Sequence, residues 1–251
     1  MSHEKPPERR HVQIAKEIKN HSVSKVLSIG VAGNGGSFSE QAAVKYATER
    51  YEREGEGSGL GEFFIVYLLD PDGVLGVLEA GEIDLGVSAW CNNRGGIVKE
   101  YLEAYGRHRW QPEKNEDGSN VTIEILVEHM LMTRKEHGAI TTIVTQEQAY
   151  QQCKETVDAM EGIRVLFCAD TATAARGLAD GTLAEEFPGI SLEHTAVVGP
   201  EASAERYGLS VAQRDVHDHK DNKTEFIVTK RLSPEAPRED TLKKDETKVP
   251  A

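Results

Sequence analysis

Apolar runs and helical spacings alternate along the first third of the chain. The apolar runs are typical of buried strands. They lie at residues 25–31, 63–70 and 83–90. Residues 37–53 and 72–82 have the spacing of helices, and Gly81 stands where a C-cap glycine belongs. A strand–helix–strand–helix–strand order predicts a parallel sheet with helices on its faces.

The alternation continues after a long polar stretch, residues 105–120, which we expect to cross from one lobe to another. Strands are predicted at residues 121–132, 138–146, 163–170, 194–199, 209–216 and 225–231. Helices are predicted at residues 147–160, 171–181 and 200–208. The pattern indicates an α/β protein of two lobes, with parallel or mixed sheets and a central cleft where ligands usually bind.

The two ends of the chain differ in composition from the middle. Residues 1–24 are charged and interrupted by KPPERR, so we expect a disordered or loosely attached segment. Residues 232–251 have almost no large apolar side chains, and burial there cannot offset the entropy of ordering, which predicts a disordered tail. The first lobe is assigned to residues 25–120 plus 205–231, and the second lobe to residues 121–204.

Charge and cysteine content exclude several classes of partner. The formal net charge of −13 argues against binding to nucleic acid or to an anionic membrane surface. The N-terminus lacks the apolar segment of a signal peptide, and the longest apolar run, FFIVYLL, is too short to span a bilayer. Cys91, Cys153 and Cys168 have no C-x-x-C spacing, which favours a reduced cytoplasmic location.

A glycine-rich turn, GVAGNGGSFSEQAA, joins the first strand to the first helix. Counting a dinucleotide fingerprint from Gly33 places Phe38 at the third glycine, and the lysine of a phosphate loop is absent. Nucleotide binding is therefore disfavoured. The helix N-terminus with the Ser37 and Ser39 hydroxyls would suit a carboxylate or a hydroxyl-bearing ligand. A plain N-cap at Ser37, with glycines that permit a tight turn, is an equal alternative.

Six stretches follow one another in a fixed order between Val26 and Val228. They are GNGGSFSEQAA, VLEAGEIDLGVSAWCNNRGG, IEILVEHMLM, TQEQAYQQC, DTATAAR and AERYGLSVAQRDVHDHKDNKTEF. Together they resemble the motifs of the prephenate dehydratase family. The resemblance implies two α/β lobes similar to a type II periplasmic binding protein. It also implies a lyase that removes water and carbon dioxide from prephenate, giving phenylpyruvate, with no cofactor and no metal.

The resemblance assigns the main catalytic role to Thr224, which would assist departure of the ring hydroxyl with Asn222 in support. Without the resemblance, Thr224 is an ordinary threonine at the start of a strand. Contacts to a small dicarboxylate are expected from Gly36, Ser37, Phe38, Ser39, Asn92, Asn93, Arg94, Thr145, Gln148, Thr171, Thr173, Asn222 and Phe226. Arg94 lies outside the family pattern; it is a candidate for a missing positive charge, with a surface arginine as the equal alternative. Capping alone is expected of at least one threonine of the DTATAAR helix start.

The chain departs from the family motifs at three places. Glu225 replaces the arginine of Thr-Arg-Phe, and a carboxylate that faces the cleft would repel a dicarboxylate. Cys91 and Asn93 replace the glutamate and serine of Glu-Asn-Ser, and Gln146-Glu147 replaces His-Pro. No motif marks a histidine partner for Cys91, so a small buried thiol is favoured over a nucleophile.

The run DVHDHKDN offers four side chains that commonly bind metals, namely His217, Asp218, His219 and Asp221. The run lies in a charged loop, and the resembled family uses no metal there. We therefore expect no metal site.

Three functions compete on the sequence alone. The first is a prephenate dehydratase, which retention of Thr224 favours. The second is a non-aromatising prephenate decarboxylase, which removes carbon dioxide without losing the hydroxyl, and the third is a non-catalytic protein that binds small carboxylates. The departures favour divergence, and so does the composition after Lys230, where we expect a tail rather than the family's regulatory ACT domain. Feedback by phenylalanine through such a domain is not expected, whereas a homo-oligomer, dimer or tetramer, is.

Overall fold

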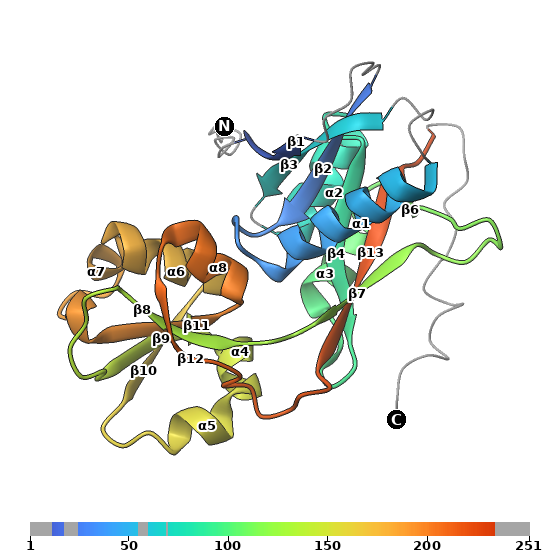
Figure 1. The fold of residues 1–251 in the computed structure, drawn as a ribbon. Helices are drawn as coiled ribbons and strands as arrows, with labels where there is room; N and C mark the ends of the chain where they lie inside the picture. The colour runs from blue at the N-terminus through green and yellow to red at the C-terminus, as the bar shows by residue number, and fades with distance from the viewer. Residues whose placement is uncertain (1–11, 18–24, 55–59, 69, 234–251) are drawn as a thin grey trace, which may run out of the picture.

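The computed structural model describes residues 12–17, 25–54, 60–68 and 70–233, and it contains two mixed sheets that form two lobes (Figure 1). The first sheet contains β1 (Val12–Glu17), β2 (Lys25–Ala32), β3 (Leu60–Leu68), β4 (Leu85–Asn92), β5 (Gly96–Ile97), β6 (Trp110–Pro112), β7 (Thr122–Leu126) and β13 (Lys223–Arg231). Its order is β1-β3-β2-β4-β13-β6, with β5 paired to β4 and β7 paired to β13.

The second sheet has the order β10-β9-β11-β8-β12. Its strands are β8 (Met130–Thr133), β9 (Thr142–Gln146), β10 (Arg164–Cys168), β11 (Thr195–Gly199) and β12 (Ser210–Gln213). In both sheets three parallel strands lie side by side, and the next strand, β13 or β8, runs antiparallel to them. The predicted fold class, two α/β lobes with mixed sheets like those of type II periplasmic binding proteins, is confirmed.

Helices cover both faces of each sheet. In the first lobe, α1 (Phe38–Glu54) packs on one face, and α2 (Pro71–Ala80) and α3 (Lys99–Tyr105) pack on the other. In the second lobe, α6 (Thr171–Asp180), α7 (Leu183–Glu186) and α8 (Glu201–Tyr207) cover one face, while α4 (Glu147–Gln152) and α5 (Lys154–Asp158) cover the other. Each sheet is therefore buried on both sides, which explains why its parallel strands are apolar runs rather than alternating ones.

The chain crosses between the lobes at residues 127–129, not at residues 105–120 as predicted. Residues 105–120 contain β6 and a turn closed by a Lys114–Asn120 bridge, both in the first lobe. The predicted strand 121–132 is two strands in different sheets, because β7 pairs with β13 whereas β8 pairs with β11 and β12. By strand pairing, β7 belongs to the first lobe and β12 to the second, so both predicted lobe boundaries are displaced.

The chain returns to the first lobe through residues 214–222, which run beside the first crossing. The backbone N–H of Val216 donates to the His129 carbonyl at 3.0 Å, and the N–H of Val127 donates to the Asn222 carbonyl at 2.8 Å. The two crossings are thus hydrogen-bonded to each other between the two sheets. They bring the start of β13 and the start of β8 to the same place, where the lobes meet.

The ends of the chain are only partly described. Within the predicted loose segment 1–24, residues 12–17 form β1, which pairs antiparallel with β3. Of the predicted tail, Leu232 is buried, and residues 234–251 lie outside the described part. The remaining residues of the N-terminal segment, 1–11 and 18–24, also lie outside it.

Two helices that reach the space between the lobes begin directly after parallel strands and are capped by aspartates. Asp70 accepts a hydrogen bond from the Gly73 N–H at the start of α2, and Asp170 accepts one from the Thr173 N–H at the start of α6. Gly81 ends α2 in the left-handed conformation, with φ of 74°, as predicted. The carboxyl ends of β3 and β10 therefore place two capping carboxylates between the lobes.

Candidate active site between the lobes

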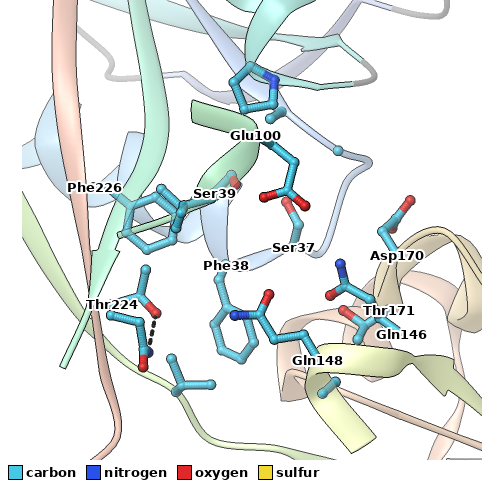
Figure 2. Close-up of a pocket in the computed structure, with 18 of the residues that line it drawn as sticks. Ser37, Phe38, Ser39, Glu100, Gln146, Gln148, Asp170, Thr171, Thr224 and Phe226 are labelled. Atoms are coloured by element: carbon cyan, nitrogen blue, oxygen red, sulfur yellow. Dashed lines mark hydrogen bonds between the residues drawn. The ribbon is translucent and has the colours of Figure 1, made fainter. Parts of the chain in front are cut away.

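A cavity of about 330 Å³ lies between the lobes, within the usual size range of small-ligand sites. Its walls come from both lobes: the start of α1, β4 and β13 on one side, and the starts of α4 and α6 on the other (Figure 2). The crossing residues Val127 and His129 form part of its lining. This placement at the ends of parallel strands is where α/β sheets usually bind their ligands.

Thr224 lies in the cavity wall at the start of β13, and its hydroxyl is held by Asn92 at the end of β4. The Asn92 side-chain N–H₂ donates to the Thr224 Oγ1 at 2.9 Å. It also lies 2.8 Å from the Asn222 Oδ1 and 3.0 Å from the Lys223 carbonyl, so two hydrogens serve three acceptors. Because Thr224 Oγ1 accepts from Asn92, its own O–H is left to donate to a ligand.

The carbonyl side of Asn92 orders the turn that follows β4. Its Oδ1 accepts from the Arg94 N–H at 2.9 Å and from the Gly95 N–H at 2.8 Å. Asn92 is 3% exposed, whereas Arg94 and Gly95 are exposed residues, so the amide links the buried end of β4 to a turn at the surface. Asn92 therefore fixes both the Thr224 hydroxyl and the 93–96 turn.

Eight of the residues predicted from sequence line the cavity. They are Ser37, Phe38, Ser39, Asn92, Gln148, Thr171, Thr224 and Phe226. Figure 2 shows Thr224 and Phe226 on one side, Thr171 on the other, and Ser37 and Phe38 between them. Ser37 and Phe38 thus line the same cavity as Thr224 and Phe226, although about 190 residues separate the two pairs in the chain.

Six predicted residues lie outside the lining: Gly36, Asn93, Arg94, Thr145, Thr173 and Asn222. Asn93 bonds to the Asp221 carbonyl and the Lys223 N–H, and Asn222 accepts from Asn92. Thr145 is fully buried and donates to the Val198 carbonyl, between two strands of the second sheet. Asn93, Asn222 and Thr145 thus support the strands and turns around the cavity.

The Arg94 guanidinium pairs with the exposed Asp221 carboxylate. The ion pair lowers the pKa of Asp221, chiefly through the hydrogen bond from Arg94. Arg94 is therefore engaged at the surface beside the site rather than in its lining, and the positive charge proposed for it stays a prediction.

Glu225, the most serious departure from the family motif, faces away from the cavity. Its Oε2 accepts a hydrogen bond from the Trp90 indole N–H at 3.0 Å. Trp90 belongs to the cluster under α2 and α3, on the opposite face of the sheet from α1. Side chains alternate along β13, so Thr224 and Phe226 lie together in the cavity wall and Glu225 lies on the other face. The change from arginine to glutamate therefore places no carboxylate in the ligand site.

The Cys91 thiol lies beside Glu225 and has no acid–base partner among the contacts of the described residues. Burial, and then the Glu225 carboxylate, raise the pKa of the Cys91 thiol. Its one hydrogen bond is a long contact to the Asn92 carbonyl, at 3.8 Å. A protonated thiol is a poor nucleophile, which agrees with the structural role expected for Cys91.

The glycine turn before α1 binds the protein's own carboxylate. The Glu40 Oε2 accepts a hydrogen bond from the Gly36 N–H, and the Ser37 Oγ accepts one from the Glu40 N–H at 3.3 Å. This reciprocal pair is a capping box, shifted by one residue from the usual arrangement. The N-cap alternative for Ser37 is therefore present in the structure, although Ser37 also lines the cavity.

His129 is a lining residue that the sequence motifs did not single out. It is 2% exposed, its ring packs edge-on to Phe38 at 5.4 Å, and its Nε2 lies 2.8 Å from the Gln152 Oε1. Burial lowers the pKa of His129 to about 4, with Gln152 opposing the shift, so the imidazole is neutral near pH 7. The signal in the sequence is the alternation of Val121, Ile123, Ile125 and Val127, which continues to His129 and predicts an inward side chain there.

Acidification is expected to destabilise the protein through His129. The folded pKa, about 4, lies below the ordinary value of 6.5, so protons bind preferentially to the unfolded chain. Stability is intact above pH 6.5, and about 3 kcal/mol is lost as the pH falls from 6.5 to 4. Urea unfolding at stepped pH should show this slope, and His129→Gln should flatten it. An equal slope in both proteins would contradict the assignment.

The charged side chains in the described lining are all acidic: Asp70, Glu100 and Asp170. Asp70 and Asp170 cap helices, whereas Glu100 has no hydrogen bond or ion pair to another described residue. Figure 2 shows the Glu100 carboxylate directed toward the Ser37 hydroxyl. For a bound anion, the positive partial charge in the lining comes from the N-termini of the helices α1, α2 and α6.

The DVHDHKDN run does not form a cluster. His217 accepts from the His129 N–H at 3.3 Å, Asp218 accepts from the N–H groups of Glu155 and Thr156, and Asp221 pairs with Arg94. In the described ranges, no three His, Cys, Asp or Glu side chains are grouped so as to hold a metal ion. The helices described here also include none with the length and apolar character needed to cross a membrane.

Fold and site together define a two-lobed α/β protein whose ligand site lies between the lobes. A family model described as prephenate dehydratase matches residues 29–234 of the chain. The chain therefore belongs to the prephenate dehydratase family.

The relatives with known names are distant. The bifunctional chorismate mutase/prephenate dehydratase of Escherichia coli K12 is 24% identical over 236 residues, which is 92% of this chain and 54% of the relative. The arogenate dehydratase/prephenate dehydratase 2 of Arabidopsis thaliana is 25% identical over 223 residues, which is 87% of this chain and 49% of the relative. The chain spans about half the length of the curated relatives it matches.

Two solved structures share the fold. The prephenate dehydratase of Arthrobacter aurescens, solved with L-Phe, has a TM-score of 0.61 at 20% identity, covering 85% of this chain and 63% of its own. GqqA, described as a novel type of quorum-quenching acylase, has a TM-score of 0.61 at 19% identity, covering 84% of this chain and 66% of its own. At such identities the likeness shows the fold alone.

Proposed function

We propose that this chain removes water and carbon dioxide from prephenate to give phenylpyruvate, with Thr224 assisting the departure of the ring hydroxyl. Membership in the prephenate dehydratase family supports the reaction class. The observation that carries the proposal for this chain is the Asn92–Thr224 hydrogen bond in the cavity wall. It leaves a hydroxyl proton available at the ligand site.

The proposed reaction breaks one C–O bond and one C–C bond of prephenate. The ring C–O bond breaks and its electron pair leaves with oxygen, which takes up one proton and departs as water. The C–C bond to the ring carboxylate breaks, carbon dioxide leaves, and that electron pair enters the ring, which becomes aromatic. Thr224 O–H supplies the hydrogen bond or proton to the departing oxygen and is reprotonated from solvent. The hydrogen bond that Asn92 donates to the Thr224 Oγ1 stabilises the negative charge that develops on Oγ1 as its proton moves to the departing oxygen.

A second candidate substrate is arogenate, the amino acid that carries an ammonium group where prephenate carries a keto oxygen. The acidic lining favours it, because both acids carry two carboxylates and Glu100 would attract the ammonium that arogenate alone carries. The Arabidopsis relative is named for both substrates. In this reading the chemistry at Thr224 is unchanged, and Glu100 selects the amino form.

Product analysis tests both candidates. The purified protein would be mixed with prephenate or arogenate at pH 7.5 and followed by NMR, with boiled protein as the control. Phenylpyruvate from prephenate supports the dehydratase, and phenylalanine from arogenate supports the amino substrate. Glu100→Gln should then shift the ratio of kcat/KM severalfold toward prephenate, since it removes the carboxylate that attracts the ammonium of arogenate. An unchanged ratio would contradict the role of Glu100.

Two other outcomes point to the alternatives raised by the sequence. A decarboxylated, non-aromatic product that keeps its hydroxyl would replace the dehydratase with a decarboxylase. Binding of prephenate without turnover, seen by calorimetry, would favour a small-carboxylate binding protein. Either result would overturn the dehydratase proposal.

A further inference from the structure

Helix α8 of the second lobe packs directly against the glycine turn of the first lobe (Figure 1). The Ser203 hydroxyl donates to the Gly36 carbonyl at 3.0 Å, and the Tyr207 hydroxyl donates to the Gly35 carbonyl at 2.7 Å. Near the same turn, the Asn34 side chain donates to the Thr173 Oγ1 at 2.7 Å. The turn is thus bonded to two helices of the other lobe.

Close approach of α8 accounts for the glycines of this turn. A Cβ on Gly36 would lie 2.9 Å from the Ser203 Cα, and Gly36 has a φ of +86°. A Cβ on Gly35 would lie 2.2 Å from the Arg206 guanidinium. Gly36 therefore requires glycine because the backbone of a helix of the other lobe occupies the space, and a side chain at Gly35 would displace the Arg206 guanidinium.

Arg206 of α8 extends across this joint to the carboxylate that caps α1. Its guanidinium lies 3.0 Å from the Glu40 Oε1, and it stacks over the Tyr67 ring at 5.4 Å. The Tyr67 hydroxyl donates to the same Oε1, and burial followed by Glu40 raises the pKa of Tyr67, so it stays protonated. The Glu40 Oε2 accepts from the Gly36 N–H. Both carboxylate oxygens are therefore occupied.

We infer that Arg206 is a positioning residue for the ligand site. Through Glu40 it fixes Gly36 and the first residues of α1, and Ser37, Phe38 and Ser39 of that segment line the cavity. Arg206 itself is not in the lining. Arg206, a side chain of the second lobe, thus sets the geometry of the cavity wall that the start of α1 forms in the first lobe. Packing of α8 against the glycine turn therefore orders this wall.

This inference rests on the proposed function only for its kinetic part. The variants are Arg206→Met, which keeps most of the packing and loses the charge, and Arg206→Lys, which keeps the charge. Arg214→Met is the matched control, because Arg214 forms an exposed ion pair with Glu201 of the same helix α8. Each would be studied by hydrogen exchange, thermal unfolding and kinetics with the preferred substrate.

Arg206→Met should speed exchange at residues 36–40 more than elsewhere and raise KM about tenfold with a much smaller change in kcat, as expected for a lost charged hydrogen bond. Arg206→Lys should recover part of both effects, and Arg214→Met should match the parent. Uniformly faster exchange in both lobes, or unchanged exchange at residues 36–40, would overturn the inference. If no substrate is turned over, the exchange result still decides it, because that measurement requires no ligand.

Discussion

Thr224→Ala is expected to lower turnover by about 10²–10⁴-fold, the range typical of a lost general acid. The structure explains why the loss should appear in kcat. Thr224 is half-buried in the cavity wall, and Asn92 already occupies its oxygen, so its proton is the group it offers to a ligand. The hydrogen bond from the Thr224 hydroxyl to the departing oxygen strengthens as charge develops on that oxygen. Binding of the substrate in its ground state depends on this hydrogen bond much less.

Thr224→Ser is the matched control, since it keeps the hydroxyl and removes one methyl group. Steady-state kinetics and calorimetric titration with the preferred substrate would measure kcat and affinity for both variants. We expect the serine variant to keep most of the turnover and the alanine variant to keep the affinity. An alanine variant that turns over at the parental rate would remove Thr224 from the mechanism and return it to an ordinary strand threonine.

Local pattern was sufficient to predict most elements of the fold. The apolar runs that form β2, β4 and β9 lie in sheets covered by helices on both faces. Their apolar composition therefore reflects their burial directly. Gly81 ends α2 because only the left-handed conformation closes that turn without strain. These features depend on neighbours within a few residues, which the sequence displays.

The crossing at residues 127–129 could not be predicted in the same way. Residues 121–132 form one apolar, alternating run, and each half finds partners in a different sheet. The pairing partners, β13 and β11, lie about 70–100 residues further along the chain. Strand choice between two sheets is decided by those long-range contacts rather than by the run itself.

The same limit applies to the site. The motifs identified Thr224, Asn92 and Ser37, because each lies in a stretch whose residue types match the family. They did not say which face of β13 lines the cavity, and so did not give the direction of Glu225, which lies on the opposite face from Thr224 and Phe226 and bonds to Trp90. Nor could they explain the glycine turn, since its closest neighbours are on α8, more than 160 residues away in the sequence. A turn that binds an anion and a turn that packs against a helix can have the same glycine pattern, so the sequence does not distinguish them.

Asn92→Ala is expected to lower both stability and turnover. The change removes donors to Thr224, Asn222 and the Lys223 carbonyl, and it removes the acceptor of two backbone N–H groups in a partly buried turn. Unpaired groups of this kind cost about 2–4 kcal/mol in total, which corresponds to a fall in melting temperature on the order of 10 °C. Asn115→Ala, in an exposed turn, should change stability by less than about 0.5 kcal/mol.

Asn92→Asp separates the two roles of this amide. The carboxylate can still accept from the N–H groups of the 93–96 turn. It has no hydrogen for the Asn222 Oδ1 or the Lys223 carbonyl and buries a charge, so we expect a loss of stability at least as large as in the alanine variant. It cannot donate to Thr224, and it would instead accept the Thr224 proton and turn the hydroxyl away from the ligand. Turnover should therefore fall by about 10²-fold or more, and further than in the alanine variant, where the Thr224 proton is not drawn away from the ligand. If both variants lose turnover to the same extent, Asn92 acts by holding the strands, and the direction of the Thr224 hydroxyl does not control the reaction.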